Sequence, residues 1–176
     1  MKREQILSLW QTCFEDEAEI PQEFMQIRDA HVQSIECDGK AVAMAGVIPV
    51  RLGELSGSYL YAVCVDPTYR GRGLFRSIMR LCEENARERG ESFLCLIAAD
   101  DALVQTYRRM GYDTEVSLRG MGGTEDVKIQ LQSDGFRCLV RDWESESLLT
   151  SGGLCKWITN DKIFLPLSFA EYMGEV

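Results

Sequence analysis

The segment that most constrains the fold of this chain is an apolar run that passes through a glycine-bearing loop into an amphipathic helix. Residues 59–65 read YLYAVCV, which is typical of a strand, and Asp66-Pro67 ends this run. After TYRGRG, apolar residues recur at helical spacing over residues 74–89, and Gly90 is typical of the position after a helix end. The chain is therefore predicted to pack a helix against a sheet.

The segments on either side indicate that this sheet is mixed. Further strands are predicted over residues 32–37, 41–50, 93–99 and 112–118, and further helices over residues 3–14 and 102–110. Asp38-Gly39 predicts a two-residue turn, and the polar residues 53–58 predict a loop. Strands followed by one strand–helix–strand crossover favour an α+β fold with a mixed sheet.

Strict alternation along residues 59–65 also predicts how this strand faces its neighbours. Leu60, Ala62 and Cys64 are expected on one side of the sheet, with Tyr61, Val63 and Val65 on the other.

The chain after residue 120 has a different pattern. Alternating segments predict strands over residues 127–132, 136–141, 154–159 and 162–167, the last two as a hairpin. We therefore divide the chain into a core, residues 1–120, and a β-rich C-terminal extension, residues 121–176, packed on the same domain. The extension could complete the sheet, wall a cleft or form a homodimer contact.

The charge of the chain limits its partners. The 176 residues carry a formal net charge of -9, which repels phosphate polymers and anionic lipid surfaces. We therefore expect no nucleic acid and no membrane as a main partner. No apolar run approaches the roughly 20 residues that span a bilayer.

The cysteines and the histidine limit the chemistry. None of the seven cysteines forms a CxxC pair, which favours reduced thiols and a cytoplasmic protein. The first residues lack the apolar core of a signal peptide, which favours the same compartment. His31 is the single histidine, so no metal site is expected.

The loop before the long helix has the properties of an anion site. The first N–H groups of a helix lack partners within the helix, and the helix dipole adds partial positive charge there. Gly71 and Gly73 carry no Cβ atoms that would keep a phosphate from the backbone, and Arg70 and Arg72 add full charges. This loop can therefore hold a polyanionic cofactor on an acidic chain.

Two familiar phosphate loops do not match this one. A P-loop needs Lys followed by Ser or Thr after its glycines, and the Rossmann fingerprint needs Gly or Ala where Arg76 stands. From spacing alone, a charged helix start without any ligand stays an alternative reading.

Two motifs give this region a family likeness. Residues 70–75, RGRGLF, resemble motif A of the GNAT superfamily of N-acetyltransferases, matching at Arg70 and Gly73 and departing at Phe75, where Gly or Ala is usual. Residues 100–112, DDALVQTYRRMGY, are similar to a second motif of that family. Tyr107 matches there, whereas Asp100 stands where Asn is usual. The resemblance covers about residues 1–118.

The resemblance implies the fold and the cofactor. It implies a mixed, mostly antiparallel twisted sheet flanked by helices, with acetyl-CoA in a cleft where strands 59–65 and 93–99 splay apart. Backbone groups of the first strand would pair with the pantetheine, amides of the loop would hold the diphosphate, and Asp100 would contact the pantetheine or only cap its helix. The implied cofactor-binding residues are Val63, Cys64, Val65, Arg70, Gly71, Arg72, Gly73, Leu74, Phe75 and Asp100.

The resemblance also implies a reaction. A small-molecule or peptide amine would attack the thioester directly, an amide near Val65 could stabilise the developing oxyanion, and Tyr107 would protonate the departing thiolate. The base is not identified; Glu54 and Asp66 are candidates, and an acyl-cysteine at Cys64 is a minor alternative. The acidic residues 15–19 could attract a cationic amine or form only a solvated face.

Two other classes of function stay open. Phe75 and Asp100 favour a module that binds acyl-CoA as a sensor without catalysis. In the other class, the protein binds no cofactor, and the β-rich extension serves as a protein-interaction surface.

Overall fold

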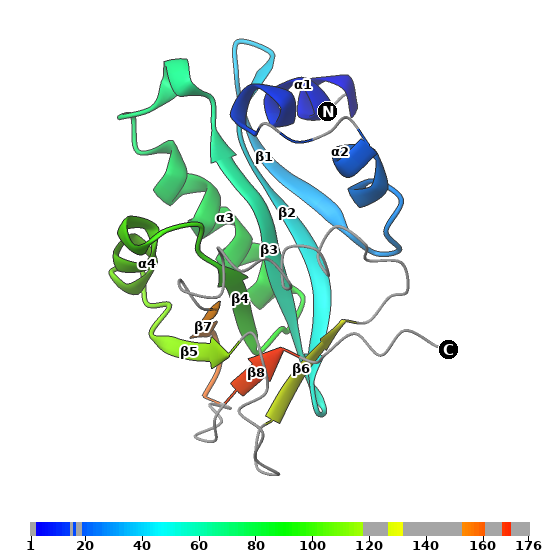
Figure 1. Ribbon diagram of the computed structural model, residues 1–176, viewed down its shortest axis with the longest axis vertical. Helices are drawn as coiled ribbons and strands as arrows, with labels where there is room; N and C mark the ends of the chain where they lie inside the picture. Colours follow the sequence, from blue (N-terminus) through cyan, green and yellow to red (C-terminus); the bar gives the residue numbers. More distant parts are fainter. Residues whose placement is uncertain are drawn as a thin grey trace.

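The computed structural model describes residues 3–14, 16, 19–117, 127–131, 153–160 and 167–169. The helices are α1 (Arg3–Cys13), α2 (Glu19–Phe24), η1 (Pro67–Tyr69, a 3-10 turn), α3 (Leu74–Glu88) and α4 (Asp101–Arg108). The strands are β1 (His31–Cys37), β2 (Lys40–Leu52), β3 (Leu55–Val65), β4 (Phe93–Ile97), β5 (Thr114–Ser117), β6 (Val127–Leu131), β7 (Gly153–Trp157) and β8 (Leu167–Phe169). Within these residues the strands form one sheet of eight in the order β1-β2-β3-β4-β7-β5-β8-β6 (Figure 1).

Most neighbouring strands in the sheet are antiparallel. The parallel pairs are β3 with β4, β5 with β8 and β6 with β8. Together with the flanking helices, this arrangement confirms the predicted α+β fold with a mixed, mostly antiparallel sheet.

The sheet separates two apolar cores, one on each face (Figure 1). On one face, Trp10 of α1 and Phe24 of α2 pack against the sheet. On the other face, Ile78 of α3 and Tyr107 of α4 do so. β2 is buried on both faces because its residues alternate between the two cores: Ala43, Ala45 and Val47 face α3, and Met44, Ile48 and Val50 face α1 and α2.

The first two turns of the sheet are tight. Asp38 (φ 50°) and Gly39 (φ 75°) form the predicted two-residue turn between β1 and β2. The predicted loop over residues 53–58 is wrong, because β3 already begins at Leu55. Ser58 of β3 is buried, and its hydroxyl donates a hydrogen bond to Glu91 Oε2 at 2.8 Å. This bond lets a polar residue lie inside the strand.

A bulge in β3 changes which residues face each core. Ala62 and Val63 lie between the pairs Met44↔Cys64 and Gly46↔Tyr61, where β2 has a single residue. Ala62 has a left-handed φ of 49°, an unusual conformation for a residue with a Cβ. The predicted alternation is therefore wrong: Leu60 shares a core with Val63 and Val65, and Tyr61 shares the other with Cys64.

The C-terminal strands complete the sheet. β7 lies between β4 and β5 and is antiparallel to both. Of the segment predicted to form a hairpin with it, residues 162–167, the structure describes only Leu167, which pairs with β5 and β6. β6 also pairs with β2, over Val50–Leu52. The predicted strand over residues 136–141 lies outside the described residues, as does the domain boundary near residue 120, which stays a prediction. In the part of the chain that the structure describes, no helix combines the length and apolar character needed to cross a bilayer.

Candidate active site

The candidate site lies where β3 and β4 part. The parallel pairing between them covers Gly57↔Phe93, Ser58↔Leu94 and Tyr59↔Cys95, and β3 continues to Val65 without β4 beside it. Two cavities open along this part of β3, and they share Phe14, Val63 and Leu103 in their walls. The predicted splaying of the two strands is therefore present.

The first cavity, called here the Gly73 cavity, has a volume of about 350 Å³. It is lined by Cys13, Phe14, Val63, Cys64, Val65, Arg70, Gly71, Gly73, Leu74, Phe75 and Leu103. Eight of the ten predicted cofactor-binding residues thus lie around one space. The other two do not line it: Arg72 lies over the Tyr69 ring, 4.9 Å from its centroid, and Asp100 begins α4.

The loop that lines the Gly73 cavity leaves the N-terminal end of α3 without a capping side chain. Gly71 and Gly73 have φ values of 75° and 76°, a left-handed conformation that favours glycine. A Cβ atom built at either position meets no protein atom within 4 Å. Gly73 is also the N-cap of α3, and no side chain caps the helix there. The first amides of α3 are therefore available to an anion, as the sequence predicts.

The start of α4 shows the opposite arrangement. The Asp100 carboxylate accepts a hydrogen bond from the Leu103 amide at 2.7 Å, which makes Asp100 an N-cap. Of the two roles predicted for Asp100, the structure shows the cap.

We expect Asp100→Ala to lower the free energy of unfolding by about 1 kcal/mol, because the N-cap hydrogen bond is lost. Asp100→Asn should cost little, since its amide oxygen can still accept the Leu103 bond. Urea unfolding of the two variants tests this, and equal losses in both would contradict the capping role.

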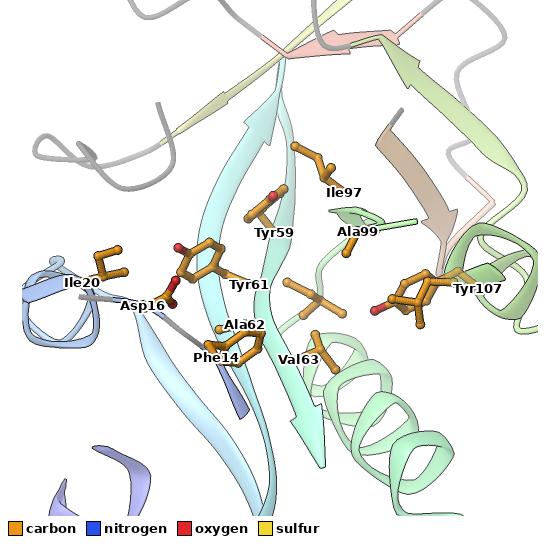
Figure 2. A pocket seen from close by; sticks show the side chains of 12 residues that line it. Phe14, Asp16, Ile20, Tyr59, Tyr61, Ala62, Val63, Ile97, Ala99 and Tyr107 are labelled. Atoms are coloured by element: carbon orange, nitrogen blue, oxygen red, sulfur yellow. The ribbon is translucent and has the colours of Figure 1, made fainter. Parts of the chain in front are cut away.

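The second cavity, called here the Tyr107 cavity, has a volume of about 240 Å³ and is not lined by the Gly-Arg-Gly loop (Figure 2). Its lining comprises Phe14, Asp16, Ile20, Tyr59, Leu60, Tyr61, Ala62, Val63, Ile97, Ala99, Leu103 and Tyr107. Figure 2 shows the Tyr107 hydroxyl turned toward this space. Burial, and to a lesser extent Asp100, raise the pKa of Tyr107, so the phenol stays protonated at neutral pH.

Phe75 explains one departure from the family motif. Its ring packs against Tyr107, with centroids 5.6 Å apart and planes tilted by 52°. The bulk at position 75 therefore supports the tyrosine that lines the Tyr107 cavity.

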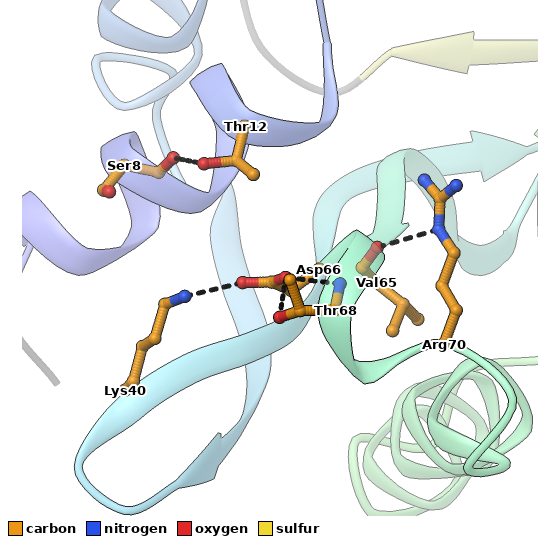
Figure 3. A network of polar contacts seen from close by, with 7 residues as sticks. All are labelled: Ser8, Thr12, Lys40, Val65, Asp66, Thr68 and Arg70. Atoms are coloured by element: carbon orange, nitrogen blue, oxygen red, sulfur yellow. Dashed lines mark hydrogen bonds and ion pairs between the residues drawn. The ribbon is translucent and has the colours of Figure 1, made fainter.

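A polar network holds the chain just before the Gly-Arg-Gly loop (Figure 3). The buried Asp66 carboxylate accepts hydrogen bonds from the Thr68 amide and hydroxyl and pairs with Lys40 at 2.7 Å. The Arg70 Nε atom donates to the Val65 carbonyl at 3.4 Å. These contacts fix the direction in which the chain leaves β3. Hydrogen bonds from Lys40 and Thr68 lower the pKa of Asp66 to about 2.

This low pKa predicts a pH dependence of folding. The pKa of an Asp side chain in an unfolded chain is about 3.9. The stabilisation from the Asp66 contacts is therefore fully present above that value and is lost as the pH falls toward 2. We expect Asp66→Asn to be less stable than the unchanged protein at pH 6, with the difference shrinking at pH 3. Urea midpoints at both values test this, and a difference independent of pH would contradict it.

The other candidate residues lie away from the cavities. Glu54 is exposed at the turn between β2 and β3, where it faces Arg51 at 4.0 Å, and His31 begins β1. Asp66 lines neither cavity. α1 and the segment after it bring Cys13, Phe14 and Asp16 to the cleft. Sequence reasoning missed Cys13 and Phe14, whereas Asp16 belongs to the acidic residues expected either to attract a cationic amine or to form a solvated face. The only signal was the acidic run over residues 15–19, most of which lies outside the described residues.

Comparisons with known proteins agree with this geometry. The family model described as acetyltransferase (GNAT) domain matches residues 2–114. No curated protein matches the chain.

Among solved structures, the fold is similar to that of a GNAT family N-acetyltransferase, YhbS, from Escherichia coli in complex with CoA. That match has a TM-score of 0.62 and 17% identity, and it covers 96% of this chain and 84% of the other. The ribosomal-protein-S18-alanine N-acetyltransferase from Escherichia coli is also similar, with a TM-score of 0.58, 16% identity, and 92% and 93% of the two chains covered. Since the family model covers well over half of the sequence, the chain belongs to the GNAT acetyltransferase family.

Proposed function

We propose that this protein transfers an acetyl group from acetyl-CoA to a primary amine. The observation that carries this proposal is the open start of α3 beside the stretch of β3 that β4 leaves unpaired, both in the wall of one cavity. Donors for a diphosphate and a strand edge for an extended amide chain thus lie next to each other. None of the six described cysteines is in a disulfide, which fits a cytoplasmic enzyme.

The residues present fit acetyl-CoA. The space around the Cβ positions of Gly71 and Gly73 is open, and no side chain caps α3 at Gly73. The amides after these glycines would hold the diphosphate, with Arg70 and Arg72 adding charge. The backbone of residues 63–65 would pair with the amides of the pantetheine as an added strand does. Acetyl-CoA would supply an activated thioester at the junction of the two cavities.

In the proposed reaction, Tyr107 is the proton donor. The raised pKa keeps its hydroxyl protonated, and no hydrogen-bond partner occupies that hydroxyl among the described residues. The same burial that raises the pKa of the phenol would raise the basicity of a thiolate in this cavity. Tyr107 can therefore donate a hydrogen bond and then its proton to the departing sulfur. The acceptor attacks as the neutral amine, after its ammonium form has lost a proton to water. The Tyr107 phenolate would then regain the proton that the amine nitrogen releases as the amide forms.

Direct attack by the amine fits this site better than an acyl-cysteine. Burial, with a smaller effect from Cys13, raises the pKa of the Cys64 thiol far above its usual range. That shift disfavours the thiolate that a nucleophilic cysteine needs. An amine bound in the Tyr107 cavity needs no nucleophile from the protein.

The structure also gives a packing or capping role to the two residues that depart from the family motifs, Phe75 and Asp100, and that favoured a binding module without catalysis. Phe75 supports Tyr107, and Asp100 caps α4. Neither residue blocks the cleft, and both favour a working enzyme.

Thermal unfolding with acetyl-CoA tests the proposal first. A ligand at about 100 times its Kd stabilises the folded state by about 2.7 kcal/mol, which raises Tm by several degrees. We expect this rise, followed by thiol release when a panel of amines is added. A Tm that does not change with millimolar acetyl-CoA would exclude the proposed function.

A further inference from the structure

We propose that Asp16 selects the acceptor, and that the acceptor is a primary amine with a single positive charge on an apolar or aromatic body. This inference rests on the proposed function, because it concerns the amine that would be acetylated. Asp16 lies between α1 and α2 and lines the Tyr107 cavity. Of the described residues in that lining, it alone carries a charged side chain.

The Asp16 carboxylate is held in a defined position. The indole Nε1 of Trp10 donates a hydrogen bond to its Oδ2 atom at 2.8 Å. Trp10 is itself only 1% exposed, and its ring packs 5.4 Å from that of Phe24 and 5.8 Å from that of Tyr61. A carboxylate has several acceptor positions, and this bond uses one of them. The remaining positions can receive the N–H groups of an ammonium ion.

The position of Asp16 suits an amine that must reach the thioester. Figure 2 shows Asp16 and Ile20 at one side of the cavity and Tyr107 at the other, with Tyr61 between them. The amine would therefore enter past the carboxylate and move toward the tyrosine. Because this cavity and the Gly73 cavity share Val63 in their walls, an amine there would lie close to the proposed thioester.

The rest of the wall defines the body of the acceptor. Ile20, Ile97 and Phe14 provide apolar surface, and the rings of Tyr59 and Tyr61 can also face a cation. A polyamine or an aminoglycoside would bring several charges against this wall, and charges without partners are costly to remove from water. Among the described residues of the wall, one carboxylate and apolar side chains thus favour a compact monoamine.

The test compares the unchanged protein with Asp16→Asn, using phenethylamine as the acceptor. Asparagine has the same size and keeps an oxygen for Trp10, but it removes the charge. Asp16 is exposed to solvent, where an ion pair is weaker than a buried one. We therefore expect KM for phenethylamine to rise about fivefold, with kcat changed by less than about twofold, because one charge-assisted contact is lost. Glu19→Gln is the matched control, since Glu19 is an exposed acid that does not line the cavity, and it should leave KM unchanged.

An arylamine such as aniline separates charge recognition from a change of shape. It is uncharged at neutral pH, so its KM should be the same in Asp16→Asn and in the unchanged protein. An equal rise for both amines would overturn the role of Asp16, as would an unchanged KM for phenethylamine. Better turnover of spermidine or of a lysine peptide than of phenethylamine would overturn the proposed acceptor class.

A binding measurement keeps this inference separate from the proposed function. In protein saturated with CoA, phenethylamine should raise Tm further in the unchanged protein and in Glu19→Gln, but not in Asp16→Asn. If no amine is acetylated, the proposed function fails, yet this rise would still support the amine site. A Tm that phenethylamine does not raise in the unchanged protein would overturn it.

Discussion

Replacing Tyr107 with phenylalanine is expected to lower kcat for amine acetylation by about 100-fold or more, because the departing thiolate loses its proton donor. The Tm rise caused by acetyl-CoA should stay, since the proposed cofactor contacts come from the Gly-Arg-Gly loop and from β3. The stability of the free protein should also stay, because no described residue bonds to the Tyr107 hydroxyl. Steady-state thiol release and thermal unfolding measure these effects.

Tyr112→Phe is the matched control for this variant. The Tyr112 ring lies 5.8 Å from that of Tyr107, on the same face of the sheet, but it lines neither cavity. Its hydroxyl is buried without a hydrogen-bond partner, so its removal should cost no stability. Activity should therefore survive in Tyr112→Phe. If both variants retain full kcat, Tyr107 is a packing residue.

The second large effect is expected from Gly73→Asp, which should weaken acetyl-CoA binding by about 100-fold or more. The new carboxylate would compete for the amides that start α3 and repel the diphosphate, and each lost bond to a charged group costs about 1.5–3 kcal/mol. The left-handed φ of 76° adds backbone strain of about 1–2 kcal/mol for a residue with a Cβ. Titration of Tm with acetyl-CoA measures the affinity.

Gly90→Asp separates the strain from the loss of binding. Gly90 follows the other end of the same helix, with a φ of 71° and open space around the position of an added Cβ. Aspartate there suffers a similar strain and faces the negative end of the helix dipole. We expect the stability of Gly90→Asp to fall at least as far, with acetyl-CoA affinity unchanged. Equal loss of affinity in both variants would mean that strain, and not the anion site, explains the effect at Gly73.

The parts of this structure that depend on local sequence could be predicted. The turn at Asp38-Gly39, the helix end at Gly90 and the cap at Asp100 each need only a few neighbouring residues. The uncapped helix start at Gly73 belongs to the same class, because its glycines and the helix that follows are adjacent in the chain.

The features that sequence reasoning missed depend on distant partners. The strand at Ser58 needs Glu91, which lies 33 residues further along the chain, and the bulge at Ala62 is set by the register with β2. No Gly or Pro marks that bulge in YLYAVCV. Asp16 was noted only as part of an acidic run, since its place in the cleft depends on the indole of Trp10.

The place of β7 in the sheet bears on how the protein is made. β4 and β5 each have one edge that pairs with β7, residues 153–157. Because the ribosome makes β4 and β5 first, these two edges lack their partner until β7 has been made. Unpaired strand edges invite pairing with other chains. This part of the sheet can therefore close only after residues 153–157 have been made, and a chain that ends before Gly153 lacks the strand that pairs with both edges.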